Sequence, residues 1–239
     1  MDDFTVGIWI WNGVEELDFA GPYEVLTSWA RMAADERTIS VRLVSANTDP
    51  ITCSHGLRVI PDVALSDLGP VDLFLHPGGQ VGPLLEDDEF QAGLRERASE
   101  TLMTSVCNGA LVYAKAGLLT GRPAATHWSA VEPLAELGAN VDPDARFVDD
   151  GNVVTSAGVS AGIDMALHLV HRLHDEEWRA ACGTTSSTSP RRPSKRRSAE
   201  RARPELGEPT TKQAAEDRPG SRGSGDGRAH RRALRAPRS

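Results

Sequence analysis

Strand-like and helix-like segments alternate along most of this 239-residue chain, and that alternation limits the possible folds more than any other feature. The strand-like segments are short runs rich in β-branched and aromatic residues: 4–11, 39–45, 57–60, 71–75, 102–106, 146–148 and 153–156. The helix-like segments carry apolar residues at helical intervals: 23–34, 84–99, 109–116, 129–137 and 162–173. Strands separated by helices usually pair in parallel and are covered on both faces. The sequence therefore predicts an α/β protein, a three-layer sandwich around a mostly parallel sheet.

The composition changes abruptly near residue 183. Residues 1–182 hold 11 Lys and Arg against 28 Asp and Glu, a net charge of −17, whereas residues 183–239 hold 15 against 6, a net charge of +9. The second segment has almost no large apolar residues, so it cannot offset the entropy lost on ordering. We expect a folded domain, 1–182, and a disordered basic tail, 183–239. The tail either contacts nucleic acid or acidic partners, or is passive, for example a C-terminus altered by a shifted reading frame. The abrupt change favours the passive interpretation.

Charge, hydropathy and cysteine count exclude several classes of protein. The acidic body argues against nucleic-acid binding by the folded domain. The sequence has no apolar run of ~18 residues, as a transmembrane helix needs, and its N-terminal MDDF does not resemble a secretory signal. We therefore expect a cytoplasmic protein without a membrane partner. The three cysteines have no paired or His-clustered spacing, so they predict neither a disulfide framework nor a metal site.

Three segments are expected where an open parallel sheet binds its ligands, at the carboxyl ends of the strands. They are the loop that holds Asp18, the loop Pro77-Gly78-Gly79, and Cys107. Cys107 comes directly after a strand-like run and just before a helix-like one, which is the arrangement of a nucleophile elbow. A thiol at a helix N-terminus meets unpaired N–H groups and the positive end of the helix dipole. We therefore expect its thiolate to be stabilised.

Each of these residues also has a purely structural interpretation. Cys107 can be a buried core cysteine, since free cysteine is among the most buried residue types. Asp18 can complement the N-terminus of the helix that follows it. Gly78 and Gly79 can form a simple turn, or they can present backbone N–H groups as an oxyanion hole. In the catalytic interpretation, a carboxyl beside a thiolate has a raised pKa, so Asp18 can give a proton to a substrate.

Four motifs in a fixed order carry a resemblance to a known family: LHPGG, VCNGALVYAKAGLL, ATHW and TSAGVSAGIDMALHLV. Through them, residues 4–180 resemble the ThiJ/PfpI superfamily, whose members are class I glutamine amidotransferase-like proteins with a flavodoxin-like fold. Within it, the chain is most similar to the isonitrile hydratase branch and to the amidase-like domains of AraC-type regulators. The resemblance implies a homodimer and a site that needs no metal or organic cofactor.

The resemblance also implies roles for individual residues. The family's reactive cysteine falls on Cys107 and its acidic partner on Asp18. The backbone amides of Gly79 and Asn108 fall on the oxyanion hole, and His127 matches a histidine near the cysteine, although a structural role is its alternative. The isonitrile hydratase branch has a threonine directly after its cysteine, so Asn108 puts water positioning by that side chain in question. The protease-like branch has a histidine there, and its absence argues against peptidase activity.

Three functions are consistent with these residues. The first is hydration of an isonitrile to an N-substituted formamide, in which Cys107 attacks the terminal carbon and Asp18 protonates it. The second is a non-enzymatic module that senses a ligand or a redox change through the same pocket and thiol. The third is glyoxalase- or deglycase-like chemistry on small aldehydes. All three imply a small-molecule ligand.

Overall fold

A seven-stranded sheet forms the centre of the fold. The computed structural model describes residues 3–181, with side chains to His174, so the predicted tail 183–239 lies outside the described residues. In spatial order the strands are β10 (Phe147–Asp150), β11 (Val153–Ser156), β7 (Leu102–Val106), β6 (Leu73–His76), β1 (Phe4–Trp9), β2 (Ile39–Ser45) and β5 (Val63–Ala64). Every neighbouring pair is parallel except β10 and β11, which form an antiparallel hairpin. The prediction of a mostly parallel sheet is confirmed.

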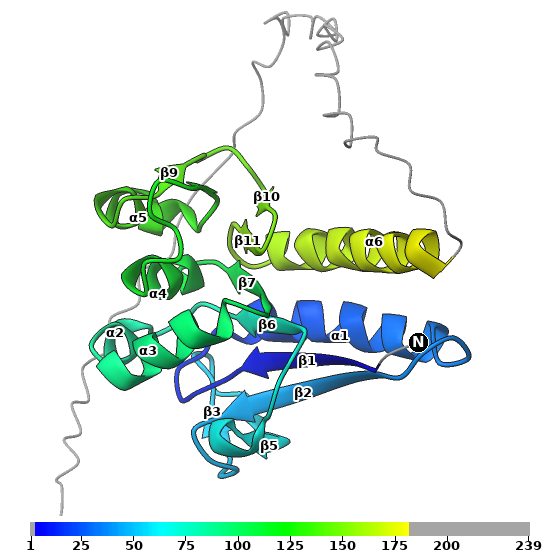
Figure 1. The fold of residues 1–239 in the computed structure, drawn as a ribbon. Helices are drawn as coiled ribbons and strands as arrows, with labels where there is room; N and C mark the ends of the chain where they lie inside the picture. The colour runs from blue at the N-terminus through cyan, green and yellow to red at the C-terminus, as the bar shows by residue number, and fades with distance from the viewer. Residues whose placement is uncertain (1–2, 182–239) are drawn as a thin grey trace, which may run out of the picture. The chain divides into compact units, whose positions relative to one another are not determined.

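Helices cover both faces of the sheet (Figure 1). Helices α1 (Glu16–Met32) and α6 (Ala161–Ala181) lie side by side on one face. The other face carries α2 (Gly82–Leu85), α3 (Asp88–Arg97), α4 (Gly109–Lys115) and α5 (Val131–Glu136). The predicted three-layer sandwich is therefore confirmed. Within residues 3–181, no helix is long and apolar enough to cross a membrane.

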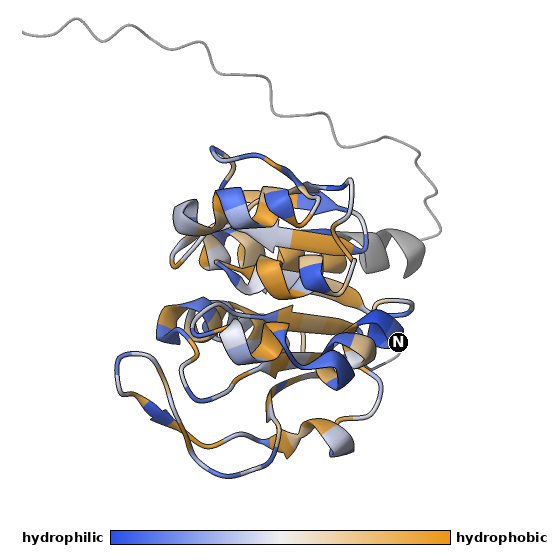
Figure 2. Ribbon diagram, turned by 90° about the vertical axis from the view of Figure 1, so that its left-hand side faces the viewer, coloured by the Kyte–Doolittle hydropathy of each residue, from blue (hydrophilic) through white to orange (hydrophobic). Residues whose placement is uncertain are grey.

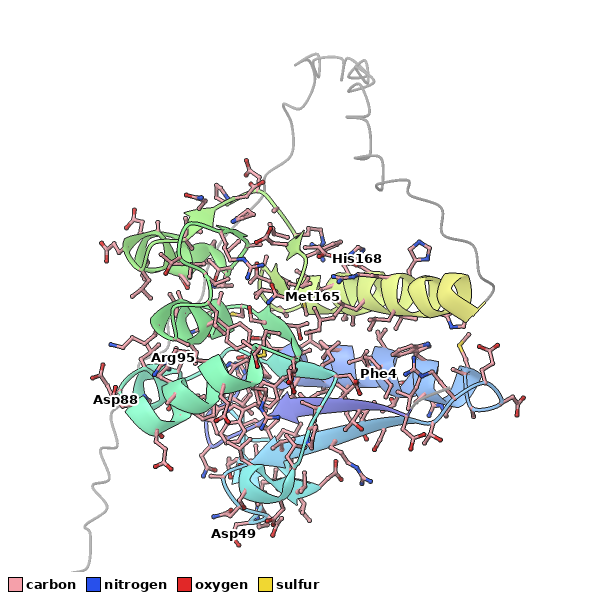
Figure 3. All side chains as sticks on the ribbon, in the orientation of Figure 1. Phe4, Asp49, Asp88, Arg95, Met165 and His168 are labelled. Carbon is pink, nitrogen blue, oxygen red and sulfur yellow. The ribbon has the colours of Figure 1, made fainter. Side chains whose placement is uncertain are left out.

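Two apolar clusters hold the layers together, one on each face of the sheet. Ile8, Leu26 and Met165 belong to the cluster under α1 and α6, whereas Phe74 and Tyr113 belong to the cluster under α3 and α4. All five side chains are fully buried. Figure 2 shows the strands as mainly apolar and the outer faces of the helices as mainly polar, and Figure 3 shows side chains filling the space between the layers.

Helix α1 begins earlier than the sequence predicts. The helix was expected over 23–34, after Pro22, but it starts at Glu16 and contains Pro22. Pro22 has no N–H, so the carbonyl of Asp18, four residues before it, lacks its usual helical partner. Gly21 permits a close approach to α6, because a Cβ there would lie 2.7 Å from Cγ1 of Ile163. This packing overrides the local signal and puts Asp18 in the first turn of α1.

Other differences are local. The predicted strand 57–60 is reduced to β4 (Arg58–Val59), which pairs with β3 (Ile51–Thr52) in a separate hairpin. The predicted helix 84–99 is split into α2 and α3, because the side chain of Asp87 accepts a hydrogen bond from the amide of Phe90 (2.9 Å) and starts a new helix. Six short elements were not predicted: β3, β5, η1 (Leu65–Asp67), β8 (Pro123–Ala124), η2 (Trp128–Ala130) and β9 (Asn140–Val141).

Candidate active site

Cys107 forms the sharp turn between β7 and α4. Its φ is 60°, in the left-handed region that residues with a side chain rarely adopt. Its amide donates to the carbonyl of Ser156 (3.1 Å), and its own carbonyl accepts from Oγ1 of Thr126 (2.7 Å). Gly109 allows the turn to pack tightly, because a Cβ there would lie 2.5 Å from the carbonyl oxygen of His76. The backbone thus has the geometry that the sequence predicts for an elbow, and the turn is held from both sides.

Asp18 lies beside this turn and is fully buried. Its Oδ2 accepts a hydrogen bond from the amide of Gly78 (3.0 Å), and its Oδ1 accepts one from the amide of Val159 (2.9 Å). The carboxyl also hydrogen-bonds the Cys107 side chain. The buried carboxyl of Asp18 therefore joins the turn at Cys107 to two loops. One loop contains Gly78, 60 residues after Asp18, and the other contains Val159, 141 residues after Asp18. The structure brings Asp18 and Cys107 together, as the sequence predicts.

The electrostatics of this pair differ from expectation in one respect. Burial raises the pKa of Asp18, which agrees in direction with the prediction, although burial rather than a neighbouring thiolate is the main cause. Burial and the charge of Asp18 together raise the pKa of Cys107 to about 12, and the hydrogen bond from the Asn108 amide only partly opposes them. The expected thiolate is therefore not the resting state when Asp18 is ionised. The two groups share a proton over a wide pH range, and that proton can lie on the sulfur or on the carboxyl.

The loop Pro77-Gly78-Gly79 closes against the pair. A Cβ on Gly78 would lie 2.4 Å from Oδ1 of Asn108, 2.7 Å from Oδ2 of Asp18 and 2.7 Å from Cβ of Cys107. No side chain fits there. His76 is fully buried and supports the loop, because its Nδ1 donates to the carbonyl of Pro77 (2.8 Å). Burial lowers the pKa of His76 to about 4, so its imidazole is neutral.

The resemblance assigns the backbone amides of Gly79 and Asn108 to an oxyanion hole, and both amides already make hydrogen bonds. The amide of Gly79 donates to Oδ1 of Asn108 (2.9 Å), and Nδ2 of Asn108 donates back to the Gly79 carbonyl (3.0 Å). The backbone amide of Asn108 itself hydrogen-bonds the Cys107 sulfur. The structure thus brings Gly78, Gly79 and Asn108 to the elbow, and ties the Gly79 amide to a side chain.

His127 lies near the Cys107 sulfur. A Cβ on Gly158 would lie 2.5 Å from Cδ2 of His127 and 3.3 Å from Sγ of Cys107, so the imidazole and the thiol flank the same point. Nδ1 of His127 is 2.7 Å from Oγ of Ser129, and its ring contacts that of Trp128, with centroids 5.2 Å apart. Trp128 is 79% exposed. The imidazole of His127 therefore lies near the Cys107 sulfur, with the exposed indole of Trp128 next to the imidazole.

The sequence analysis gave no site role to the loop between β11 and α6, although this loop lies in the TSAGVSAGIDMALHLV motif and supplies part of the site. Val159 donates its amide to Asp18 from a left-handed backbone conformation with φ 59°, and Gly158 leaves room for His127. The available signal was the run of small residues 156–162, directly after a strand. Thr126, which holds the Cys107 carbonyl, was also missed as a site residue, although it lies in the ATHW motif.

A separate polar cluster lies near the start of α1. Glu15, Glu16 and His55 offer ligand atoms within 4.8 Å of one another, the one such grouping among residues 3–174. Nδ1 of His55 is 2.9 Å from Oε2 of Glu16, and this contact raises the pKa of His55. His55 is largely exposed, so the cluster has the character of a solvated ion pair. It carries no argument for a metal.

The fold and the site define a class of protein: a parallel α/β sandwich with a left-handed cysteine at the carboxyl end of a central strand and a buried carboxyl beside it. The chain belongs to the DJ-1/PfpI family, whose family model matches residues 5–172. The predicted family resemblance is confirmed.

The similar proteins with known names include an enzyme and transcriptional regulators. The chain is 40% identical over 170 residues to isonitrile hydratase from Pseudomonas putida, an alignment that covers 70% of this chain and 71% of that protein. It is 30% identical over 185 residues to the HTH-type transcriptional regulator GbdR from Pseudomonas aeruginosa, covering 76% of this chain but 47% of the regulator. A solved structure of a ThiJ/PfpI family protein from Pseudomonas syringae matches with a TM-score of 0.64 at 28% identity, covering 79% of this chain and 78% of that one. The family thus includes both an enzyme and transcriptional regulators among this chain's relatives.

Proposed function

We propose that this protein hydrates an isonitrile to an N-substituted formamide, with Cys107 as nucleophile and Asp18 as proton donor and acceptor. The observation that carries the proposal is the buried Asp18 carboxyl hydrogen-bonded to the Cys107 side chain, because this pair can hold one proton in either of two places. The similarity to isonitrile hydratase supports it.

The first step uses the proton on the carboxyl. With that proton on Asp18, the Cys107 sulfur is a thiolate and adds to the terminal carbon of the isonitrile. An S–C bond forms, one C≡N π pair moves to nitrogen, and the lone pair left on carbon takes the proton of Asp18. The product is a thioimidate on Cys107, and Asp18 is left ionised.

The second step uses the carboxylate. Asp18 accepts a proton from a water molecule as the water oxygen adds to the thioimidate carbon, and it passes that proton to the substrate nitrogen. The C–S bond then breaks as the carbonyl forms, and the remaining hydroxyl proton moves to the sulfur. The overall change is addition of one water to the isonitrile, which gives the formamide and restores the pair. Two backbone amides, from Gly78 and Val159, stabilise the carboxylate form that this step requires.

Cyclohexyl isocyanide is a suitable probe, with N-cyclohexylformamide measured as the product. We expect the wild-type protein to form the formamide and both Cys107→Ala and Asp18→Asn to lose at least ~10²-fold in rate, since each removes one half of the pair. Cys53→Ala is the matched control, because Cys53 is a buried thiol of another part of the fold. Equal rates for wild type and Cys107→Ala would exclude catalysis by the thiol.

A second candidate is a ligand- or redox-sensing role. The observation that favours it is the match to a transcriptional regulator through about half of that regulator's length. A sensor requires no turnover, so it predicts that cyclohexyl isocyanide is not consumed while a bound ligand, or oxidation of Cys107, shifts the melting temperature. Consumption of methylglyoxal by wild type but not by Cys107→Ala would instead support the aldehyde chemistry of the third function.

The proposal also covers the oligomeric state of the protein, its cellular location and its C-terminal segment. From the family resemblance we infer a homodimer that binds a small molecule. From the sequence itself we infer a cytoplasmic location and a separate disordered segment at residues 183–239. Light scattering on the purified protein tests the dimer, which has twice the 25.7 kDa of one chain. Limited proteolysis tests the tail: we expect cleavage after residue 182 to leave a stable fragment, and resistance of the tail to cleavage would overturn that expectation.

A further inference from the structure

Asn108 has a role at the Cys107 site that the elbow motif alone does not show. Its side chain is tied to Gly79 by two hydrogen bonds, one accepted from the Gly79 amide (2.9 Å) and one donated to the Gly79 carbonyl (3.0 Å). Because both polar atoms of the amide group are used, the side chain has one preferred orientation. We call this pair of hydrogen bonds the Asn108–Gly79 clamp.

The clamp places a carbonyl-like oxygen next to the nucleophile. A Cβ on Gly78 would lie 2.4 Å from Oδ1 of Asn108 and 2.7 Å from Cβ of Cys107, so this oxygen and the cysteine side chain lie on either side of one small gap. Oδ1 also accepts the Gly79 amide. In an oxyanion hole, the oxygen of a substrate carbonyl would accept this Gly79 amide while the sulfur attacks the carbonyl carbon. Oδ1 of Asn108 therefore takes the place of that substrate oxygen.

The consequence differs between reaction types. When a thiolate attacks an ester, amide or aldehyde carbonyl, the C=O π pair moves to oxygen, and the oxyanion needs N–H donors. When a thiolate attacks an isonitrile carbon, the charge develops on carbon and is removed by the proton of Asp18, with no oxyanion in that step. Because the Gly79 amide already donates to Asn108, the site can still support attack on an isonitrile. It lacks one N–H donor for the oxyanion that forms when the sulfur attacks a carbonyl.

We propose that Asn108 is a specificity-determining residue: through the Asn108–Gly79 clamp it withholds an oxyanion donor and so disfavours attack of the Cys107 sulfur on carbonyl substrates. The inference rests on the proposed function for its biological meaning. The clamp itself is a property of the chain and can be tested without an isonitrile.

The test compares two reactions of the same sulfur. In the first, 4-nitrophenyl acetate acylates Cys107: the S–C bond forms, the carbonyl π pair moves to oxygen and returns as the C–O bond to 4-nitrophenolate breaks, and the thiol proton goes to Asp18. In the second, iodoacetamide alkylates Cys107 by direct displacement of iodide, which forms no oxyanion. The ratio of the two rate constants cancels changes in thiol pKa and access, so it isolates the oxyanion donor.

We expect Asn108→Ala to raise the ratio of acylation to alkylation by about 10-fold or more, since one oxyanion donor is worth ~10²- to 10³-fold in other enzymes and the freed Gly79 amide regains part of that. Asn140→Ala is the matched control: Nδ2 of Asn140 donates to the carbonyl of Gly121 at 2.8 Å, far from the pair in sequence, and its loss should leave the ratio unchanged. An unchanged ratio in Asn108→Ala would overturn the proposal.

A second variant covers a failure of Asn108→Ala to fold. Asn108→Thr keeps a polar side chain but cannot make both hydrogen bonds, so it should also raise the ratio, and a ratio at the wild-type value would contradict the clamp. The outcomes separate the two proposals. If the variants raise the ratio but the wild-type protein does not hydrate the isonitrile, the clamp is supported and the proposed function is refuted. If the wild-type protein hydrates the isonitrile but the ratio is unchanged in the variants, the proposed function is supported and the clamp is refuted.

Discussion

Gly78 is the position where the packing around the Cys107–Asp18 pair can be tested most sharply. Adding one methyl group, Gly78→Ala, places a carbon 2.4 Å from Oδ1 of Asn108 and 2.7 Å from both Oδ2 of Asp18 and Cβ of Cys107. Each distance is about 1 Å shorter than an ordinary van der Waals contact of 3.5–4 Å. Gly78 is not among the left-handed glycines of residues 3–181, so the effect comes from space alone.

The neighbours have little freedom to move. Oδ1 of Asn108 is held in two hydrogen bonds, and Oδ2 of Asp18 accepts the Gly78 amide itself. The loop must therefore shift by a sizeable fraction of 1 Å. Overpacking of this kind typically costs about 1–3 kcal/mol, and a shift of about 1 Å at a reacting group can lower its rate by ~10²-fold.

The assay is a thermal melt combined with the rate of Cys107 alkylation by iodoacetamide. For a domain of this size, each kcal/mol corresponds to about 2–4 °C in Tm, so Gly78→Ala should lower Tm by several degrees and change the alkylation rate. Gly93→Ala is the matched control, because Gly93 lies within α3 with nothing within 4 Å of its would-be Cβ. That variant should stabilise the fold by about 0.5–1 kcal/mol. A Tm and an alkylation rate for Gly78→Ala equal to those of the wild type would refute the packing argument.

Three further predictions concern the same site. Because burial raises the folded-state pKa of Asp18 above its unfolded value, its contribution to stability is present at low pH and lost as pH rises through the folded pKa; the Tm of the wild type should fall relative to that of Asp18→Asn across this window, and a constant difference would contradict the raised pKa. Hydration should require the one-proton state of the pair, so the rate should rise with pH through the Asp18 pKa and fall only as the Cys107 thiol ionises near its pKa of about 12; a decline at neutral pH would be inconsistent with this. Thr126→Val leaves the Cys107 carbonyl without its 2.7 Å donor and should lower the unfolding free energy by about 1 kcal/mol in a denaturant titration; no change would show that the hydrogen bond does not hold the elbow.

The meeting of Asp18 and Cys107 could be predicted because both follow strands of one parallel sheet. The carboxyl ends of such strands lie at one edge, so Asp18, in the segment that follows β1, and Cys107, directly after β7, are expected to lie close without any knowledge of side-chain packing. Gly78 and Gly79, after β6, were found by the same reasoning. The seven-stranded order itself was not predicted, since it depends on which strands pair.

The parts that were missed depend on long-range packing. Val159 reaches Asp18 only because β11 pairs with β7 and because Val159 adopts a left-handed backbone, which no local pattern of a valine indicates. The early start of α1 depends on contact between Gly21 and Ile163, 142 positions later in the chain, against the local signal of Pro22.

The sign of the Cys107 pKa shift shows a limit of another kind. The sequence predicts a helix N-terminus beside the thiol, and α4 is indeed there, but it is only seven residues long. The opposing effects, burial of the thiol and the charge of Asp18, follow from packing in three dimensions, and together they outweigh the Asn108 amide. The helix N-terminus beside Cys107 and the neighbouring charge of Asp18 could be predicted from the sequence, whereas the extent to which the thiol is buried could not.

The central claim is that the Cys107 sulfur bonds covalently to the isonitrile carbon with a proton from Asp18. Intact-mass measurement after rapid mixing with cyclohexyl isocyanide and acid quenching tests it directly. We predict a mass increase of one isonitrile molecule, located by peptide mapping on Cys107, that decays as the formamide is released. Formamide production without any adduct on Cys107, or an adduct that maps to Cys53 instead, would contradict the account.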